Sequence, residues 1–76
     1  RFMIRISVSY EKGDCYTCDD VTKIVYTDVI GTEMTVEGEE LLNHHFPIGR
    51  TLWVHSSNGT GSVSGSGIRA IDVYEA

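Results

Sequence analysis

Two cysteines and three histidines are the residues of this 76-residue chain whose types suit metal binding. Cys15 and Cys18 are spaced C-x-x-C, and His44, His45 and His55 follow them along the chain. Thiolate sulfur and imidazole nitrogen suit tetrahedral zinc, which would help to stabilise so small a domain. However, cysteines three residues apart on a regular strand point to opposite faces, and there is no second C-x-x-C pair. No resident metal is expected, and a zinc module through the two cysteines with His44 and His45 is kept as an alternative.

The segment 56–67 is rich in serine and glycine, a composition that can bind anions. Backbone N–H groups of small residues can line an anion-binding concavity, and hydroxyl groups add further donors. The candidate ligand-binding residues are Ser57, Asn58, Gly59, Thr60, Arg50 and Arg69. The segment matches neither the Walker A pattern nor G-x-G-x-x-G, and a hairpin with an Asn-Gly turn explains the same residues. Phosphate or nucleotide binding by this loop and Arg69 is therefore a second alternative.

Catalysis by the histidines would need a nucleophile nearby and a third group that orients the imidazole ring. No serine or aspartate stands at a recognisable spacing from any of the three histidines. The pentapeptide 61–65, GSVSG, has valine where the G-x-S-x-G elbow of hydrolases requires the serine nucleophile. We therefore expect a protein that is not an enzyme, with no catalytic residue and no cofactor.

The chain is acidic, with 11 carboxylate side chains against 6 lysines and arginines and a formal net charge of −5. Nine of the acids lie between residues 11 and 40, together with only two lysines. Binding to nucleic acid requires clustered cations that neutralise phosphates, so the charge argues against this class of partner. A basic protein would instead be attracted to the acidic third of the chain.

Apolar residues make up 41% of the chain, which indicates a folded domain rather than a disordered segment. No apolar run approaches the roughly 20 residues that span a bilayer, and the N-terminus lacks the apolar stretch of a secretory signal. Two thiols are also too few for a disulfide framework. These features predict a cytoplasmic protein with reduced cysteines and no membrane contact.

Apolar and polar residues alternate through most of the chain, which is typical of half-buried β-strands. Strands are expected at 2–10, 15–18, 21–26, 32–37, 52–54, 62–64 and 68–74. Glycines between these runs suit tight turns because they tolerate positive φ angles. One short helical turn is expected at 38–43, and Phe46 and Ile48 are expected to anchor the following loop on the core. The predicted fold class is all-β, a small barrel or sandwich of six to seven strands.

The segments 4–28 and 50–75 share one order of elements: strand, glycine turn, strand, short turn, strand. Residues 6–8 align with 52–54, and residues 12–13 align with 58–59, both at an offset of 46. Few aligned positions are identical, so chance similarity between two hairpins stays open. We expect one domain over residues 1–76, with two hairpin-plus-strand units whose packing would remove exposed sheet edges.

Two aromatic residues are expected to face outward from their strands. Trp53 alternates with apolar neighbours in the strand at 52–54, as Tyr74 does in the strand at 68–74. An exposed tryptophan beside a tyrosine is typical of a protein-binding hot spot, although a fold that buries both faces would make Trp53 core.

The main hypothesis is therefore a non-catalytic binding protein that acts through a surface. A homo-oligomer is the most economical partner arrangement, because a small β domain gains core by self-association. Inhibition of a larger protein through a basic site is a variant of the same hypothesis. The expected surface comprises Trp53, His55 and Tyr74, with the acidic residues Glu37, Glu39 and Glu40 as a second patch.

Overall fold

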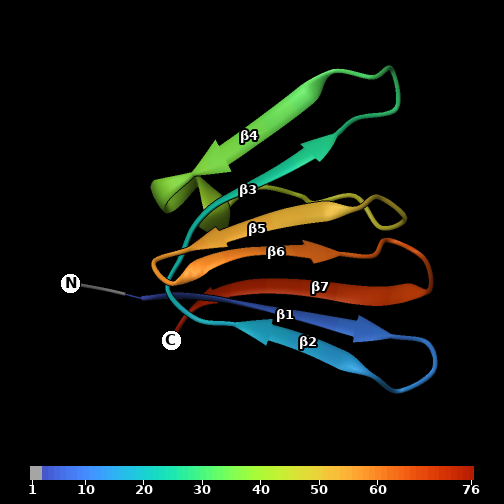
Figure 1. The fold of residues 1–76 in the computed structure, drawn as a ribbon, viewed down its shortest axis with the longest axis horizontal. Helices are drawn as coiled ribbons and strands as arrows, with labels where there is room; N and C mark the ends of the chain where they lie inside the picture. The colour runs from blue at the N-terminus through green and yellow to red at the C-terminus, as the bar shows by residue number, and fades with distance from the viewer. Residues whose placement is uncertain (1–2) are drawn as a thin grey trace.

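The computed structural model describes residues 3–76, which form two antiparallel sheets in a sandwich (Figure 1). The elements described are β1 (Ile4–Tyr10), β2 (Cys15–Cys18), β3 (Val21–Thr27), β4 (Glu33–Glu37), the 3-10 helix η1 (Gly38–Leu42), β5 (Leu52–Ser56), β6 (Gly59–Val63) and β7 (Ile68–Glu75). Sheet A has the strand order β2-β1-β7, and sheet B has the order β4-β3-β5-β6. The sheets do not close into a barrel, so the all-β prediction is confirmed in its sandwich form. Phe2, expected in the first strand, lies outside the described residues.

The segments 4–28 and 50–75 exchange their third strands. The hairpin β1–β2 belongs to sheet A, but β3 crosses to sheet B and pairs with β5. The hairpin β5–β6 belongs to sheet B, and β7 crosses to sheet A and pairs with β1. Strands of the segments 4–28 and 50–75 thus occupy equivalent places in the two sheets, and β4 extends sheet B beside β3.

Burial along the central strands follows the hydrophobic pattern, with one local exception. In β1, Ile6 and Val8 have no exposed surface, and the residues between and beside them are half-buried. In β3, Val21 and Ile24 are three residues apart and yet both are buried. A bulge between Val21 and Lys23 shifts the register against β5, so that both apolar side chains face inward.

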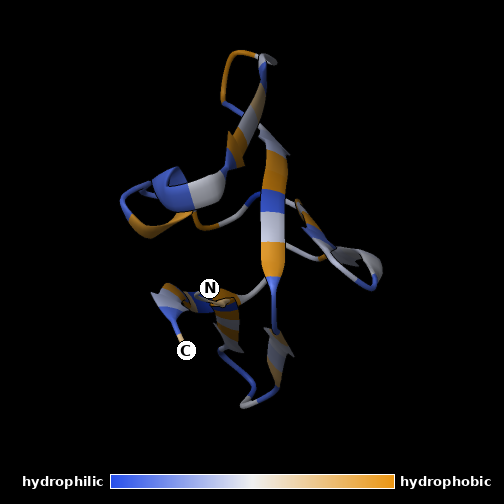
Figure 2. Ribbon diagram, turned by 90° about the vertical axis from the view of Figure 1, so that its left-hand side faces the viewer, coloured by the Kyte–Doolittle hydropathy of each residue, from blue (hydrophilic) through white to orange (hydrophobic). Residues whose placement is uncertain are grey.

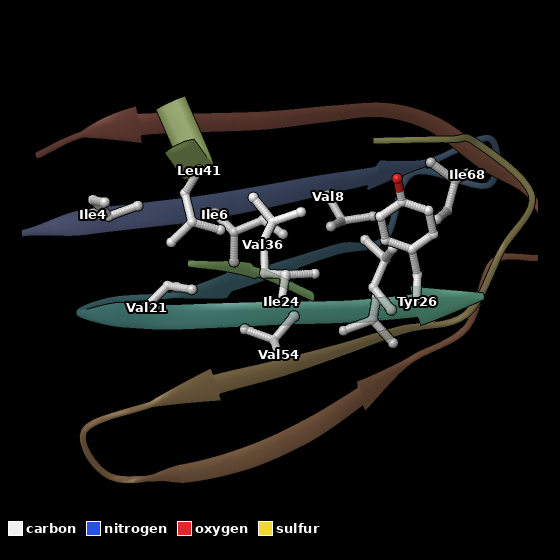
Figure 3. Packing of buried hydrophobic residues seen from close by; sticks show 12 residues of the cluster. Ile4, Ile6, Val8, Val21, Ile24, Tyr26, Val36, Leu41, Val54 and Ile68 are labelled. Atoms are coloured by element: carbon white, nitrogen blue, oxygen red, sulfur yellow. The ribbon is translucent and has the colours of Figure 1, made fainter. Parts of the chain in front are cut away.

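Apolar side chains from both sheets form one core in residues 3–76 (Figure 3). Its members are Ile4, Ile6, Val8, Val21, Ile24, Tyr26, Val36, Leu41, Leu52, Val54, Val63 and Ile68. Figure 3 shows Ile6 and Val8 of β1 directed toward Ile24 and Tyr26 of β3, with Leu41 entering from η1. Neither sheet can bury its apolar face without the other, since this core lies between them.

Most predicted strand ends lie within two residues of the observed ones, and β6 differs most. The strand predicted at 62–64 begins at Gly59, because Thr60 and Gly61 pair with β5. Glycine has a low strand propensity, and this concealed the first half of β6 in the sequence. The helical turn predicted at 38–43 is η1, and none of the described residues forms a helix long and apolar enough to cross a membrane.

The loop after η1 is anchored differently from the prediction. Phe46 packs against the core as expected, but Ile48 is 57% exposed, so its predicted role as an anchor is wrong. His44 provides the second anchor instead. Its Nε2 lies 2.6 Å from the hydroxyl oxygen of Tyr26, and its ring meets that of Phe46 edge-on at 4.7 Å between centroids.

The connection from β6 to β7 passes directly over the segment that leads into β5. A Cβ atom added at Gly65 would lie 2.4–2.5 Å from the backbone atoms of Arg50. The hydroxyl of Tyr10 also donates a hydrogen bond to the carbonyl of Ser64 at 2.9 Å. A glycine at position 65 therefore allows the two backbone segments to cross in contact.

We predict that Gly65→Ala lowers the free energy of unfolding by about 1–3 kcal/mol, because the added methyl group forces these two backbones apart. Urea denaturation of the purified protein measures this change. Ser66→Ala is the matched control, since its exposed side chain lies next to the crossing and outside it. Equal stability of Gly65→Ala and the control would contradict the close approach.

Candidate functional site

The outer face of sheet B gathers several of the predicted site residues. It consists of the side chains that alternate with the core positions of its four strands. We call it the sheet B face; its residues are Lys23, Val25, Thr27, Glu33, Thr35, Glu37, Trp53, His55, Thr60 and Ser62. These side chains range from half-buried to exposed, and Trp53 is 38% exposed.

Trp53 lies in the middle of this face because β5 is an inner strand of sheet B. It is paired with Val25 of β3 on one side and with Ser62 of β6 on the other. Val25 in turn is paired with Thr35 of β4. The indole is therefore the one large side chain in a row of small ones, and it stands above them.

A second row across the sheet is polar. His55 is paired with Lys23 on one side and with Thr60 on the other, and Lys23 is paired with Glu37. The hydroxyl oxygen of Thr60 lies 3.1 Å from Nδ1 of His55, so a hydrogen bond joins these two side chains.

Trp53 separates two shallow depressions on the sheet B face. The larger, about 370 Å³, is lined by Trp53, His55, Lys23 and Glu33 among others. The smaller, about 200 Å³, lies between Trp53 and Arg50. The larger depression is bordered by Lys23 and Glu33, and the smaller one by Arg50. The face therefore combines an aromatic centre with a polar rim.

Tyr74 lies on the other sheet, so the structure does not bring it together with Trp53. It faces Arg5 across the β1–β7 pairing, on the outer face of sheet A. The Arg5 guanidinium donates hydrogen bonds to both carboxylate oxygens of Asp19, the one from Nη2 at 3.3 Å. Asp19, and then the Tyr74 hydroxyl, raise the pKa of Arg5, and the guanidinium lowers the pKa of Asp19. The single aromatic surface expected from the sequence is thus divided between two faces.

The predicted acidic patch is also divided. Glu37 ends β4 on the sheet B face, whereas Glu39 and Glu40 belong to η1 and line a hollow of about 620 Å³ beneath β4. Met34 and His44 line the same hollow, and Trp53 does not. The patch therefore contributes one residue to the sheet B face.

The predicted anion site is not assembled. The residues Ser57, Asn58, Gly59 and Thr60 form the β5–β6 hairpin end, where the N–H of Asn58 donates to Oγ of Ser56. Arg50 precedes β5 and Arg69 lies at the start of β7, both at the opposite end of these strands (Figure 1). The whole length of the β5–β6 hairpin therefore separates the hydroxyl-rich turn from the two cations that were expected to flank it.

The predicted zinc ligands are also not assembled. Cys15 is exposed on the outer face of sheet A, and Cys18 is half-buried against the core, as the strand period requires. Nε2 of His44 is hydrogen-bonded to the Tyr26 hydroxyl, and His45 is exposed. Within residues 3–76 no three histidine, cysteine, aspartate or glutamate side chains lie close enough together to hold a metal ion.

Sequence reasoning missed one exposed apolar pair, Val29 and Ile30 in the turn between β3 and β4. Both side chains are 82% exposed. The signal was present in the sequence, because Asp28 and Gly31 are turn-forming residues and an apolar pair between them cannot enter either strand.

Comparisons with protein-family models, with curated proteins and with solved structures found no significant match to this chain.

We predict that Asp19→Asn destabilises the protein slightly at pH 7 and has no such effect in strong acid. The folded-state pKa of Asp19 is lowered, so the ion pair with Arg5 stabilises the fold above the unfolded-state pKa. That contribution is lost as the pH falls through the folded-state pKa. The effect is small because both side chains are exposed to solvent.

Thermal unfolding at pH 7 and in acid tests this prediction. Asp72→Asn is the control for the loss of one negative charge, because Asp72 lies on the same face and no ion pair is described for it. A destabilisation by Asp19→Asn that persists unchanged in acid would show that the ion pair is not its cause.

Proposed function

We propose that this protein is a non-catalytic interaction protein that binds a second copy of itself through the sheet B face. The observation that carries the proposal is the uncovered face of a four-stranded sheet with Trp53 at its centre. A partly exposed tryptophan among small, β-branched and hydroxyl side chains is the composition of an interface core. The free thiols Cys15 and Cys18 support the cytoplasm as its site of action.

The charges on the face favour a second copy as the partner. Lys23 is its cation, Arg50 lies at its border beside Trp53, and Glu33 and Glu37 are its carboxylates. In an isologous two-fold dimer each patch meets itself, so cations of one copy can lie over carboxylates of the other. A strongly charged partner of one sign would gain nothing from this balanced face.

The size of the face predicts a weak dimer. Strands of about five residues and four strands abreast span roughly 15–20 Å in each direction at usual strand spacings. This area is smaller than the standard interface, which buries about 800 Å² per partner. Small interfaces of this kind are typical of transient complexes. Association is therefore expected at micromolar concentrations, with dissociated monomers that remain folded.

We predict that Trp53→Thr raises the dissociation constant of the dimer about 30-fold or more, as expected for loss of a central hot spot. Threonine keeps a β-branched side chain in the strand, so the fold is retained. Sedimentation velocity across a concentration series measures the dissociation constant, and thermal unfolding verifies the fold.

Tyr74→Thr is the matched control, because Tyr74 is an aromatic residue of similar exposure, 41%, on the outer face of sheet A. It should leave the dissociation constant unchanged. A wild-type protein that stays monomeric at millimolar concentration, or a dimer that Tyr74→Thr dissociates, would refute the proposal.

A further inference from the structure

The turn between β3 and β4 displays two aliphatic side chains at its tip. Val29 and Ile30 are each 82% exposed, compared with 57% for Ile48 and 38% for Trp53. Figure 2 shows this turn at the upper end of the molecule, with a hydrophobic segment at its outermost point. The pair belongs neither to the core nor to the sheet B face, so the fold does not explain its exposure.

Four hydrogen bonds hold this turn in one conformation. Oδ1 of Asp28 accepts from the backbone N–H of Ile30 at 3.0 Å and of Thr32 at 2.9 Å. The N–H of Asp28 donates to the Thr32 carbonyl at 2.9 Å, and the N–H of Gly31 donates to the Asp28 carbonyl at 3.1 Å. Gly31 has a φ of 90°, which favours glycine at this position. The two aliphatic side chains are therefore presented by an ordered turn, which reduces the entropy that binding would cost.

The arm that carries this tip is strongly acidic. We define the arm as β3, β4, their turn and η1, residues 21–42; it contains five carboxylates and one lysine. Its net charge of −4 accounts for most of the −5 of the whole chain. Asp28 and Glu33 lie at the two ends of the turn itself. An apolar tip with a negative surround is complementary to an apolar pocket that is bordered by lysine or arginine.

We propose that Val29 and Ile30 insert into an apolar, basic-rimmed pocket of a different protein. A second copy of this chain is a poor host for the tip. Its net charge of −5 would repel the acidic arm. Its hollow between η1 and β7, about 550 Å³, is bordered by Asp72 and two histidines, and its depression beside Trp53 and Arg50 is small, about 200 Å³. An anionic bilayer is also disfavoured, because the carboxylates of the arm would be repelled from its surface.

This proposal does not depend on self-association through the sheet B face. The tip lies beyond the end of β3 and β4, while the dimer contact is centred on Trp53 in β5. A dimer would present two tips, so self-association would raise avidity for a partner with two pockets.

Site-specific photo-crosslinking tests the proposal. The full chain carries benzoylphenylalanine at position 30, or at position 48 as a matched exposed apolar control, and is irradiated in an extract of its source cells. The expected result is a crosslink from position 30, absent from position 48, whose attachment site in the partner lies in an apolar pocket bordered by lysine or arginine.

Binding to the purified partner provides the quantitative test. Val29→Ser with Ile30→Ser is expected to weaken binding by about tenfold or more, while Ile48→Ser leaves it unchanged. Association of the wild type is expected to slow as the salt concentration rises, because salt screens the attraction between the carboxylates of the arm and a basic rim. Both side chains at the tip are exposed, so the serine variant keeps the fold, which thermal unfolding verifies.

Three results would overturn this proposal. The first is attachment of the position 30 crosslink to the chain itself, or a loss of dimer in the serine variant, which would assign the tip to a second copy. The second is flotation of the wild type, but not the serine variant, with vesicles of phosphatidylcholine and phosphatidylglycerol. The third is a failure of position 30 to crosslink any protein that position 48 does not. Failure of the Trp53→Thr prediction alone would refute the dimer and would not contradict the proposal for the tip.

Discussion

The pairing of β1 with β7 and of β3 with β5 is the constraint on which the rest of the structure depends. Each sheet takes a strand from the other half of the chain, so neither hairpin can complete a sheet by itself. The apolar faces that result cover each other, with Ile6 and Ile24 fully buried between them and Leu41 of η1 added to the core. Both pairings join residues that are distant in sequence, which makes the fold one cooperative unit.

The crossings between the sheets require unusual backbone conformations. Asp20 lies at the crossing from β2 to β3 and has a φ of 55°, the one positive value of a non-glycine residue in the described part of the chain. Aspartate tolerates this conformation better than most side chains do. At the other crossing, from β6 to β7, Gly65 lets the chain touch the backbone of Arg50. Both crossings carry the chain from one sheet to the other, one through a positive φ angle at Asp20 and the other through a close backbone contact at Gly65.

The sandwich leaves two outer faces with different properties. On sheet A, the Arg5 guanidinium forms hydrogen bonds with Asp19 and Tyr74. These polar side chains are therefore paired with one another. On sheet B, Trp53 stands among short side chains, and the charged residues border it instead of covering it. Because of this difference we propose the sheet B face as the binding surface, although both faces carry an exposed aromatic residue.

Much of the secondary structure could be predicted because it depends on local pattern. Alternation placed strands close to all seven observed ones, and the strand period correctly separated Cys15 from Cys18. The two-residue period of a strand also predicted that Trp53 and His55 point outward from β5. The bulge at Val21 and the glycine-rich start of β6 were hidden, since both depart from regular alternation.

The amino-acid sequence by itself determined the all-β class, the turns and the inward or outward direction of most side chains. Only the tertiary structure decided which strands are neighbours, and therefore that Trp53 and Tyr74 lie on different sheets. It also decided that His44 forms a hydrogen bond with Tyr26, and that Val29 and Ile30 are exposed at the end of the arm. The physical reason is that side-chain direction follows from local backbone geometry, whereas strand pairing is selected by the burial of apolar surface shared across the whole chain.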